Sequence, residues 1–417
     1  MKKFDYPNEL NIIFDKLNNY HIRAVIVGGY VRDFFLGLDS KDIDIELYGV
    51  NSLEKVEKIL QEFGSVNSVG KSFGVCKLLY EDLDLDFSLP RRDSKIAQGH
   101  KGFTVTVDTN MDFKTAAKRR DFTMNAIGYD VIAQEILDPY NGIHDLQNKL
   151  LKAVDLEQFS EDPLRVLRAV TFATRFELTI EEDLFFLCKK MIGNGVFQEL
   201  PQERIFNEIQ KILLLSQKPS QAFVLLQRLS AFDFFREFTS LHDEDFASLL
   251  AALDRAKILS EQTECHNRLT LLLAVLSSRF SHAETLSFLE RLTADKKLTQ
   301  AILKLKNAAI DLQNIKNYAV YKLATKVNIQ LYLLYLRAIY PEQKSAIKML
   351  EQKAAKLGVL QKKLEPLMQG KDLIALGLKP SKQFSTLLNE LYDLQMREKI
   401  RTKEEAKQWL KRTLVLS

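Results

Sequence analysis

The chain has 417 residues, of which 46% are hydrophobic and 27% charged, which is typical of a globular protein with an ample core and suggests two to four domains. Its net charge of +4 excludes a strongly basic RNA-binding chain overall, and the lack of any apolar run of about 18 residues excludes a membrane span. Cys76, Cys188 and Cys265 are scattered and no leader sequence is evident, so we expect no disulfide framework, no zinc site and a cytoplasmic location.

The first informative stretch is AVIVGGYVRDFFLGLDSKDIDIELY, residues 24 to 48. AVIV predicts a buried strand, Gly28 and Gly29 allow a sharp turn that approaches a ligand closely, and YVRDFFLG has helical spacing. A glycine-rich turn that opens a helix presents free N–H groups, which suit a triphosphate. Arg32 lies in the first turn of this helix and can pair with phosphate oxygens.

The segment DIDIELY then alternates acidic and apolar residues, as in a strand with two different faces. Asp42, Asp44 and Glu46 share one face, and carboxylates about 7 Å apart along a strand can hold one or two Mg²⁺ ions. The same pattern alone also fits a solvated acidic face. Because it follows a Gly-Gly turn, we interpret Asp42 and Asp44 as the metal site of a nucleotidyl transfer.

Further along, LDLDFSLP predicts another strand, on which Asp84 and Asp86 alternate. By its position, Asp86 is a candidate third acidic group near the metal. Residues 91–103, RRDSKIAQGHKGF, predict a mobile loop beside the site, whose basic side chains either contact phosphates or are solvated. Beyond residue 140 strand signals almost disappear, and leucine-rich helical patterns punctuated by prolines take over.

Several segments occur in a fixed order along the chain. They are GGYVRD with DID shortly after it, RRDFTMNAIGYD at 119–130, ILDPYNGIHDLQNKLLKAV at 136–154, EDPLRVLRAVTFATRF at 161–176, LPQERIFNEIQKIL at 200–213 and GKDLIALGLKPSKQFSTLLNELYDLQ at 370–395. In this order they resemble the class II tRNA nucleotidyltransferases (CCA-adding enzymes) and the bacterial poly(A) polymerases. Residues 24–213 are covered well, whereas 216–340 carry no recognised motif.

The resemblance implies an α+β fold, in which a nucleotidyltransferase head with a small mixed sheet is followed by an all-α neck, body and tail. The implied boundaries are 1–140 for the head, 141–215 for the neck, 216–340 for the body and 341–417 for the tail. The tail contains 16 Lys and Arg against nine acidic residues, so it is the basic part of the chain. A basic tail suits an RNA backbone, although a solvated helical face has the same composition.

The resemblance also implies roles for individual residues. Asp42 and Asp44 would be the catalytic Mg²⁺ ligands, and Gly29, Arg32 and Arg120 would contact the incoming nucleotide. Asp121 and Asn125, next to Arg120 in RRDFTMNA, would contact its ribose.

Asp162, Arg165 and Arg168 on the predicted helix after 161 would read the base. Cytosine and adenine both present an exocyclic amine donor beside a ring-nitrogen acceptor, so one Asp and one Arg complement both and clash with guanine and uracil. The resemblance gives these roles to Asp162 and Arg165, with Arg168 on the same helix face. Asp162 also precedes Pro163, a typical helix N-cap arrangement, and capping and base contact are compatible.

One position departs from the family pattern. Many members carry a third Arg where this chain has Thr171, so either a phosphate or base contact is missing or Arg175 compensates. This leaves open whether both C and A are added or only one. His242 and Asp243 do not form the ligand pattern of an HD phosphohydrolase, so we expect no such activity.

The function implied by the resemblance is template-independent addition of CMP and AMP, from CTP and ATP, to the 3′ end of tRNA. The implied partner is tRNA, held through its acceptor and T arms, and no obligate protein partner is evident. A CC-adding or A-adding specialist and a poly(A) polymerase share these motifs and remain alternatives. A catalytically silent RNA-binding relative would lack a core residue, and none of those named above is missing.

Overall fold

The computed structural model describes residues 4–67, 75–95, 103–108, 111–376 and 382–415, and the chain forms two compact units. The first unit comprises residues 1–216 and 221–236, and the second comprises 217–220 and 237–417. The division into head, neck, body and tail is finer than this and stays a prediction. No helix in the described part of the chain is long and apolar enough to cross a membrane.

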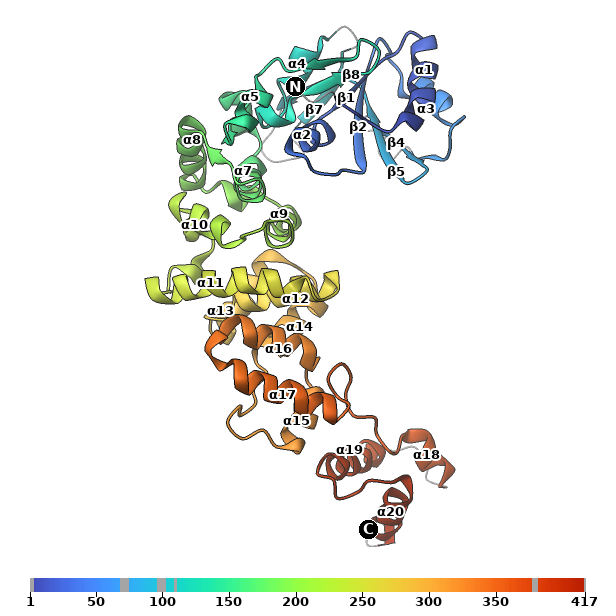
Figure 1. Ribbon diagram of the computed structural model, residues 1–417, viewed down its shortest axis with the longest axis vertical. Helices are drawn as coiled ribbons and strands as arrows, with labels where there is room; N and C mark the ends of the chain where they lie inside the picture. Colours follow the sequence, from blue (N-terminus) through green and yellow to red (C-terminus); the bar gives the residue numbers. More distant parts are fainter. Residues whose placement is uncertain (1–3, 68–74, 96–102, 109–110, 377–381, 416–417) are drawn as a thin grey trace. The chain divides into compact units, whose positions relative to one another are not determined.

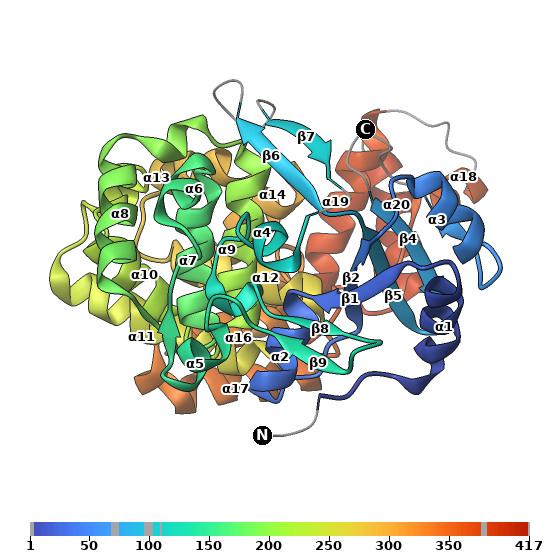
Figure 2. The same cartoon turned by 90° about the horizontal axis from the view of Figure 1, so that it is seen from above.

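A seven-stranded mixed sheet is the framework of the first unit (Figure 1). The strands are β1 (Arg23–Val27), β2 (Asp42–Tyr48), β3 (Val66–Asn67), β4 (Val75–Tyr80), β5 (Leu83–Ser88), β8 (Gly128–Asp130) and β9 (Glu135–Leu137). Their order is β3-β4-β5-β2-β1-β8-β9 (Figure 2). β2 and β5 run parallel, while the other neighbours are antiparallel. The predicted mixed sheet is confirmed, and β1 and β2 lie inside it.

The predicted strand, turn and helix at the start of the sheet are also confirmed. β1 is followed by α2 (Gly29–Leu36), which ends at Gly37 with a φ of +70°, a left-handed conformation that glycine adopts without a Cβ clash. On β2 the residues Ile43 and Ile45 are buried, whereas Asp42 and Asp44 are exposed. The alternation therefore directs the two carboxylates away from the core and towards solvent.

Helices close both faces of this sheet. α1 (Asn11–Asn19) packs against β1 and α3 (Leu53–Leu60) against β4, each through its apolar residues. α4 (Phe113–Ala117) contributes Phe113 to a cluster with Val25 and Val27 of β1. Residues two apart on a strand share a face, so Val25 and Val27 lie on the face of β1 that packs against α4.

The prediction of a loop over residues 91–103 was wrong at both of its ends. β6 (Arg91–Lys95) and β7 (Phe103–Val107) form an antiparallel ribbon, and residues 96–102 lie outside the described part. The physical reason is the sequence FTVTV, whose β-branched and aromatic residues favour an extended backbone. Once β7 is extended, the preceding polar segment can satisfy its backbone groups by pairing with it.

The rest of the first unit is helical, as predicted, apart from the two short parallel strands β10 (Leu150–Leu151) and β11 (Thr179–Ile180). Its helices are α5 (Gly142–Gln147), α6 (Leu156–Glu161), α7 (Leu164–Arg175), α8 (Glu182–Gly193), α9 (Gln202–Leu215) and α10 (Ser220–Arg228). α7 is the central helix and packs against α8 and α9. Its position brings the predicted base-reading residues next to the segment that follows α4.

The second unit is built from helices, also as predicted. They are α11 (Asp243–Ser260), α12 (Cys265–Leu276), α13 (His282–Leu292), α14 (Lys296–Lys306), α15 (Asn317–Ala324), α16 (Ile329–Ile339), α17 (Lys344–Lys356), α18 (Gly370–Ala375), α19 (Lys382–Met396) and α20 (Lys403–Val415). α12 is the core helix and contacts α11, α14 and α16. A separate small cluster around Leu373, Leu391 and Leu410 joins α18, α19 and α20.

Candidate active site

Acidic side chains gather where β2 and β5 run side by side. Because these strands are parallel and in register, Asp44 lies beside Asp86, and Asp42 beside Asp84. Neighbouring strands are about 4.8 Å apart, so Asp86, the candidate third acidic group, is a direct neighbour of the predicted metal pair. Lys77 on β4 holds Asp86 through an ion pair of 2.6 Å. A metal contact by any of these carboxylates stays a prediction.

Burial and neighbouring charges both act on the Asp44 carboxylate. The protein atoms packed around the Asp44 carboxylate raise its pKa although its side chain reaches solvent. The positive charge of Arg120 opposes this shift, and the negative charges of Asp86 and Asp42 add to it. Mg²⁺ is usually bound by one or two carboxylates together with waters and substrate phosphates. The described residues contain no group of three or more His, Cys, Asp or Glu that could hold a metal ion.

The turn before α2 is shaped around Arg120. Gly28 has a φ of +72°, and a Cβ atom there would lie 2.9 Å from Nη1 of Arg120 and 3.5 Å from Oδ2 of Asp44. Only glycine therefore lets this guanidinium approach both the turn and the carboxylates. Gly29 begins α2, where the first N–H groups have no partner within the helix. The predicted phosphate contacts of Gly29 and Arg120 fit this geometry and remain predictions.

Glu46, the third acidic residue on β2, has a different environment. It is fully buried, and its carboxylate accepts hydrogen bonds from the Tyr48 hydroxyl at 2.7 Å and from Nη2 of Arg119 at 3.0 Å. Burial alone would raise its pKa, but the charges of Arg120 and Arg119 hold the pKa of Glu46 below its usual range. Glu46 is thus an ionised group inside the protein rather than part of the open carboxylate cluster.

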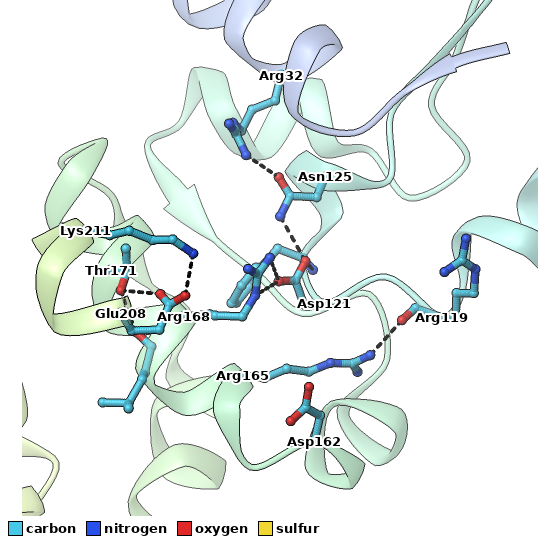
Figure 3. Close-up of polar contacts among 12 residues, drawn as sticks. Arg32, Arg119, Asp121, Asn125, Asp162, Arg165, Arg168, Thr171, Glu208 and Lys211 are labelled. Atoms are coloured by element: carbon cyan, nitrogen blue, oxygen red, sulfur yellow. Dashed lines mark hydrogen bonds and ion pairs between the residues drawn. The ribbon is translucent and has the colours of Figure 1, made fainter. Parts of the chain in front are cut away.

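A polar network joins α2 to α7 through the segment after α4 (Figure 3). Arg168 donates to Asp121 from Nε at 2.7 Å and contacts the same oxygen from Nη2 at 2.6 Å. The side chain of Asn125 donates to Asp121 at 2.9 Å and accepts from Nη1 of Arg32 at 2.7 Å. Asp121 and Asn125, predicted to contact the ribose, are both buried, and the structure uses them to connect two arginines.

Arg32 lies deeper than its predicted role suggests. It is 6% exposed, forms an ion pair with Asp33 at 2.6 Å, and lies over the rings of Phe172 and Phe176 at 5.2 and 4.8 Å. Burial lowers its pKa, and the neighbouring Asp33 opposes that shift. Arg32 therefore anchors α2 to α7, and its direct phosphate contact stays a prediction.

The predicted base-reading pair lies at the start of α7. Oδ1 of Asp162 accepts from the backbone N–H of Leu164 at 3.0 Å, which confirms the capping role. Arg165 donates from Nη1 to the carbonyl of Gln158 at 2.8 Å and from Nη2 to the carbonyl of Arg119 at 2.7 Å. A carboxylate has about four acceptor sites and a guanidinium five donors, so these bonds fix both groups and leave capacity for a base.

Sequence reasoning missed Arg204, on α9. Its Nη2 lies 3.2 Å from Oδ2 of Asp162, so Arg204 holds the carboxylate whose other oxygen accepts from the Leu164 N–H. The signal was present, because Arg204 belongs to the segment LPQERIFNEIQKIL, which had been assigned no site residue.

Thr171, where many relatives carry Arg, faces a buried acid. Its hydroxyl donates to Glu208 at 2.8 Å, and Lys211 contacts the other oxygen of Glu208 at 2.7 Å. Thr171 and Lys211, which lies one turn along α9 from Glu208, thus share this carboxylate. Arg175, the compensating residue considered from the sequence, lies over the ring of Phe176 at 4.7 Å.

Two parts of the chain match known protein families. Residues 24–152 match the family described as "Poly A polymerase head domain". Residues 177–241 match the family described as "Probable RNA and SrmB- binding site of polymerase A". The first match contains the carboxylates of β2, the Gly28 turn and Arg120.

Curated relatives and solved structures point the same way. The CCA-adding enzyme of Coxiella burnetii is 34% identical over 236 residues, which are 56% of this chain and 60% of that protein. The multifunctional CCA protein of Haemophilus ducreyi is 34% identical over 270 residues, or 61% of this chain and 63% of that protein. The matches thus span less than two thirds of these relatives.

Among solved structures, a tRNA nucleotidyltransferase complexed with a primer tRNA and an incoming ATP analog has a TM-score of 0.67 and 25% identity, covering 83% of this chain and 99% of that one. A CCA-adding enzyme complexed with ATP has a TM-score of 0.73 at 21% identity, covering 99% and 97%. The fold, the head-domain match and these relatives agree with the ordered motifs. The chain is therefore similar, over the parts compared, to tRNA nucleotidyltransferases and to bacterial poly(A) polymerases.

Proposed function

We propose that the chain adds CMP and AMP, from CTP and ATP, to the 3′ end of tRNA without a nucleic-acid template. The observation that carries the proposal is the physical link between two sets of residues. Asp44, on the strand that also carries Asp42, neighbours the turn that holds Arg120, and the residues on either side of Arg120 bind Arg165 and Arg168 of α7. The same short segment therefore connects the reaction centre with the residues suited to base selection.

In the proposed reaction the 3′-hydroxyl oxygen of tRNA attacks the α-phosphorus of the nucleotide. The bond from this phosphorus to the bridging oxygen breaks, and pyrophosphate leaves. Mg²⁺ held by Asp42 and Asp44 would neutralise phosphate charge and promote ionisation of the hydroxyl. The N–H groups at the start of α2 and the guanidinium of Arg120 would bind the triphosphate and orient its α-phosphorus.

Base selection in this proposal follows from hydrogen-bond complementarity. The Asp162 carboxylate accepts from the exocyclic amine of cytosine or adenine, and Arg165 donates to the adjacent ring nitrogen. Uracil and guanine would place a carbonyl against the carboxylate and an N–H against the guanidinium. Such unpaired buried groups lead to strong rejection. Arg204 and the carbonyl of Arg119 support the pair by fixing both side chains before the nucleotide arrives.

The names of the similar proteins support tRNA as the acceptor. Two relatives are named for CCA addition, and one similar structure is described with a primer tRNA. The basic residues of the tail, 341–417, suit an RNA backbone. Cys188 is a free and buried cysteine, in keeping with action in the cytoplasm.

A poly(A) polymerase is the second candidate, because both matched families are named for that enzyme. A specialist that adds only C or only A is a narrower form of the first. The three differ in acceptor and in nucleotide, so one primer series separates them.

The test uses tRNA transcripts that end at the discriminator base, at C and at CC, each with CTP, ATP or both. We expect all three to be extended to CCA when both nucleotides are present. Failure to add A to the transcript ending in CC would indicate a CC-adding specialist, and failure to add C to the shorter transcripts an A-adding one. Long A tails on unrelated RNA would favour the poly(A) polymerase.

The metal assignment is tested separately by Asp42→Ala. We expect loss of incorporation with tRNA binding retained, because the body and tail do not depend on this carboxylate. Asp82→Ala is the matched control, since Asp82 is an exposed acid in the turn between β4 and β5. Incorporation by Asp42→Ala at a rate close to that of the control would exclude the assignment.

A further inference from the structure

Glu46 lies two residues beyond Asp44 on β2, yet it points into the protein interior. Its side chain is 1% exposed and accepts a hydrogen bond from Arg119, outside its own strand, at 3.0 Å, while Arg120 adds a second positive charge nearby. Arg119 follows the last turn of α4, and its Nε is buried without a hydrogen-bond partner among the described residues. The hydrogen bond to Glu46 therefore helps to fix this guanidinium.

The main chain of Arg119 makes the second connection. Its carbonyl oxygen accepts from Nη2 of Arg165 at 2.7 Å, while its side chain points away from α7 (Figure 3). One residue thus reaches the catalytic strand with its side chain and the base-reading arginine with its backbone. We call Glu46, Arg119 and Arg165, with these two hydrogen bonds, the Arg119 bridge.

The bridge differs from the neighbouring contact between Asp121 and Arg168, which is an ion pair between side chains. In the bridge, Arg165 binds a carbonyl, whose position depends on where the backbone of residue 119 lies. The partly buried, charge-assisted hydrogen bond that Arg119 donates to Glu46 holds that backbone through the side chain. Movement of Arg119 by even a fraction of an ångström would tilt the plane of Arg165, and hydrogen-bond readout of a base depends on that plane.

We propose that Glu46 is a positioning residue for nucleotide selection, acting on Arg165 through Arg119. This inference rests on the proposed function, because its test measures how well Arg165 discriminates between bases. Glu46 touches neither nucleotide nor metal in this proposal. Its effect is on the orientation of a donor that lies on another element and 119 positions further along the chain.

The test compares Glu46→Gln with Tyr48→Phe. Glu46→Gln keeps the shape and one acceptor but removes the charge that holds Arg119, whereas Tyr48→Phe removes the other bond to the same carboxylate and leaves Arg119 bound. The measurement is kcat/KM for CTP and UTP on a tRNA transcript, together with the Mg²⁺ concentration at half-maximal rate. Thermal unfolding checks that both variants are folded.

We expect Glu46→Gln to lower the preference for CTP over UTP by roughly tenfold, as expected for a misplaced donor to a base. Tyr48→Phe should keep the preference, and the Mg²⁺ dependence should be that of the wild type in both. An equal loss for CTP and UTP would mean that Glu46 is only structural. A changed Mg²⁺ dependence would mean that it acts on the metal pair, and either outcome overturns the proposal.

A second pair of variants tests the bridge from its other end and covers the case in which Glu46→Gln does not fold. Arg119→Met should lower the CTP preference to the same extent, and Arg119→Lys, which keeps a charge facing Glu46, should restore much of it. Full selectivity in Arg119→Met would exclude the bridge. If the wild type incorporates neither CTP nor ATP, the proposed function fails instead, and the bridge is then tested with whichever nucleotide pair the wild type does discriminate.

Discussion

Replacement of Asp121 by Asn should destabilise the first unit through loss of one ion pair. Oδ2 of Asp121 contacts Arg168 at 2.6 and 2.7 Å, and Oδ1 accepts from Asn125 and from the N–H of Phe122, both at 2.9 Å. The amide oxygen of the new side chain can replace Oδ1. Its NH₂ group then faces the guanidinium of Arg168, where two donors meet without an acceptor.

The magnitude follows from burial. Breaking a buried ion pair typically costs about 3 to 5 kcal/mol. Arg168 is 30% exposed, so water replaces part of the lost contact, and we expect about 2 kcal/mol. For a unit of this size that corresponds to a fall in Tm of about 4 to 8 °C. The effect should be confined to the first unit, because Asp121 and Arg168 both lie in it.

The chain provides an internal control for this measurement. Its single tryptophan, Trp409, lies in the second unit, so tryptophan fluorescence reports unfolding there, while circular dichroism reports both units. Asp121→Asn should shift the circular dichroism transition and leave the fluorescence transition in place. Arg168→Met and the double variant complete a double-mutant cycle. Because the two residues are in contact, we expect a coupling free energy of unfolding above about 1 kcal/mol. Additive effects of the two substitutions would refute the reasoning.

The pH dependence of the same pair has a definite sign. Arg168 and the hydrogen bond from Asn125 hold the pKa of Asp121 below its usual range in spite of burial, which alone would raise it. When the pKa of an acid is lower in the folded than in the unfolded chain, its ionised form stabilises the fold. This stabilisation is complete above the pKa in the unfolded chain, about 3.9, and is lost as the pH falls through the pKa in the folded chain. The difference between wild type and Asp121→Asn should therefore be constant from about pH 5 to 8 and shrink below about pH 4.

Three further substitutions are expected to have separate effects. Gly28→Ala places a Cβ atom 2.9 Å from the guanidinium of Arg120, at a φ of +72°. The KM for the nucleotide should therefore rise about tenfold. Gly193→Ala is the control and should leave KM unchanged, because no atom lies within 4 Å of its added Cβ. Thr171→Val loses a buried hydrogen bond and should cost about 1 kcal/mol in urea unfolding, and equal stability would exclude that contribution. Burial lowers the pKa of Lys306 in the folded chain to about 8. Above pH 8 the unfolded chain therefore binds more protons than the folded chain does. The free energy of unfolding of the second unit, followed by the fluorescence of Trp409, should then rise towards pH 9.5. Lys306→Met should flatten this rise, and parallel curves would contradict the assignment.

Much of the catalytic head could be predicted from local sequence patterns. The alternation on β2 and the glycine turn before α2 depend on residues that are neighbours in the chain, so the strand, turn and helix were identified correctly. The ends of the 91–103 segment were not, because a polar strand such as β6 is extended only through pairing with β7. Its own composition carries no such signal.

The sequence by itself determined which chemical groups the chain has to offer: a pair of alternating acids, a glycine turn, and an acceptor and a donor at the start of one helix. The tertiary structure alone decided their partners. Parallel pairing of β2 with β5 brings Asp86 beside Asp44, and burial separates Glu46 from the acids that precede it. The three carboxylates of β2 are of one chemical type, yet Asp42 and Asp44 are exposed, whereas Glu46 is buried and bound to Arg119. Side-chain periodicity is a local property, whereas the choice of a partner depends on contacts between segments far apart in the chain.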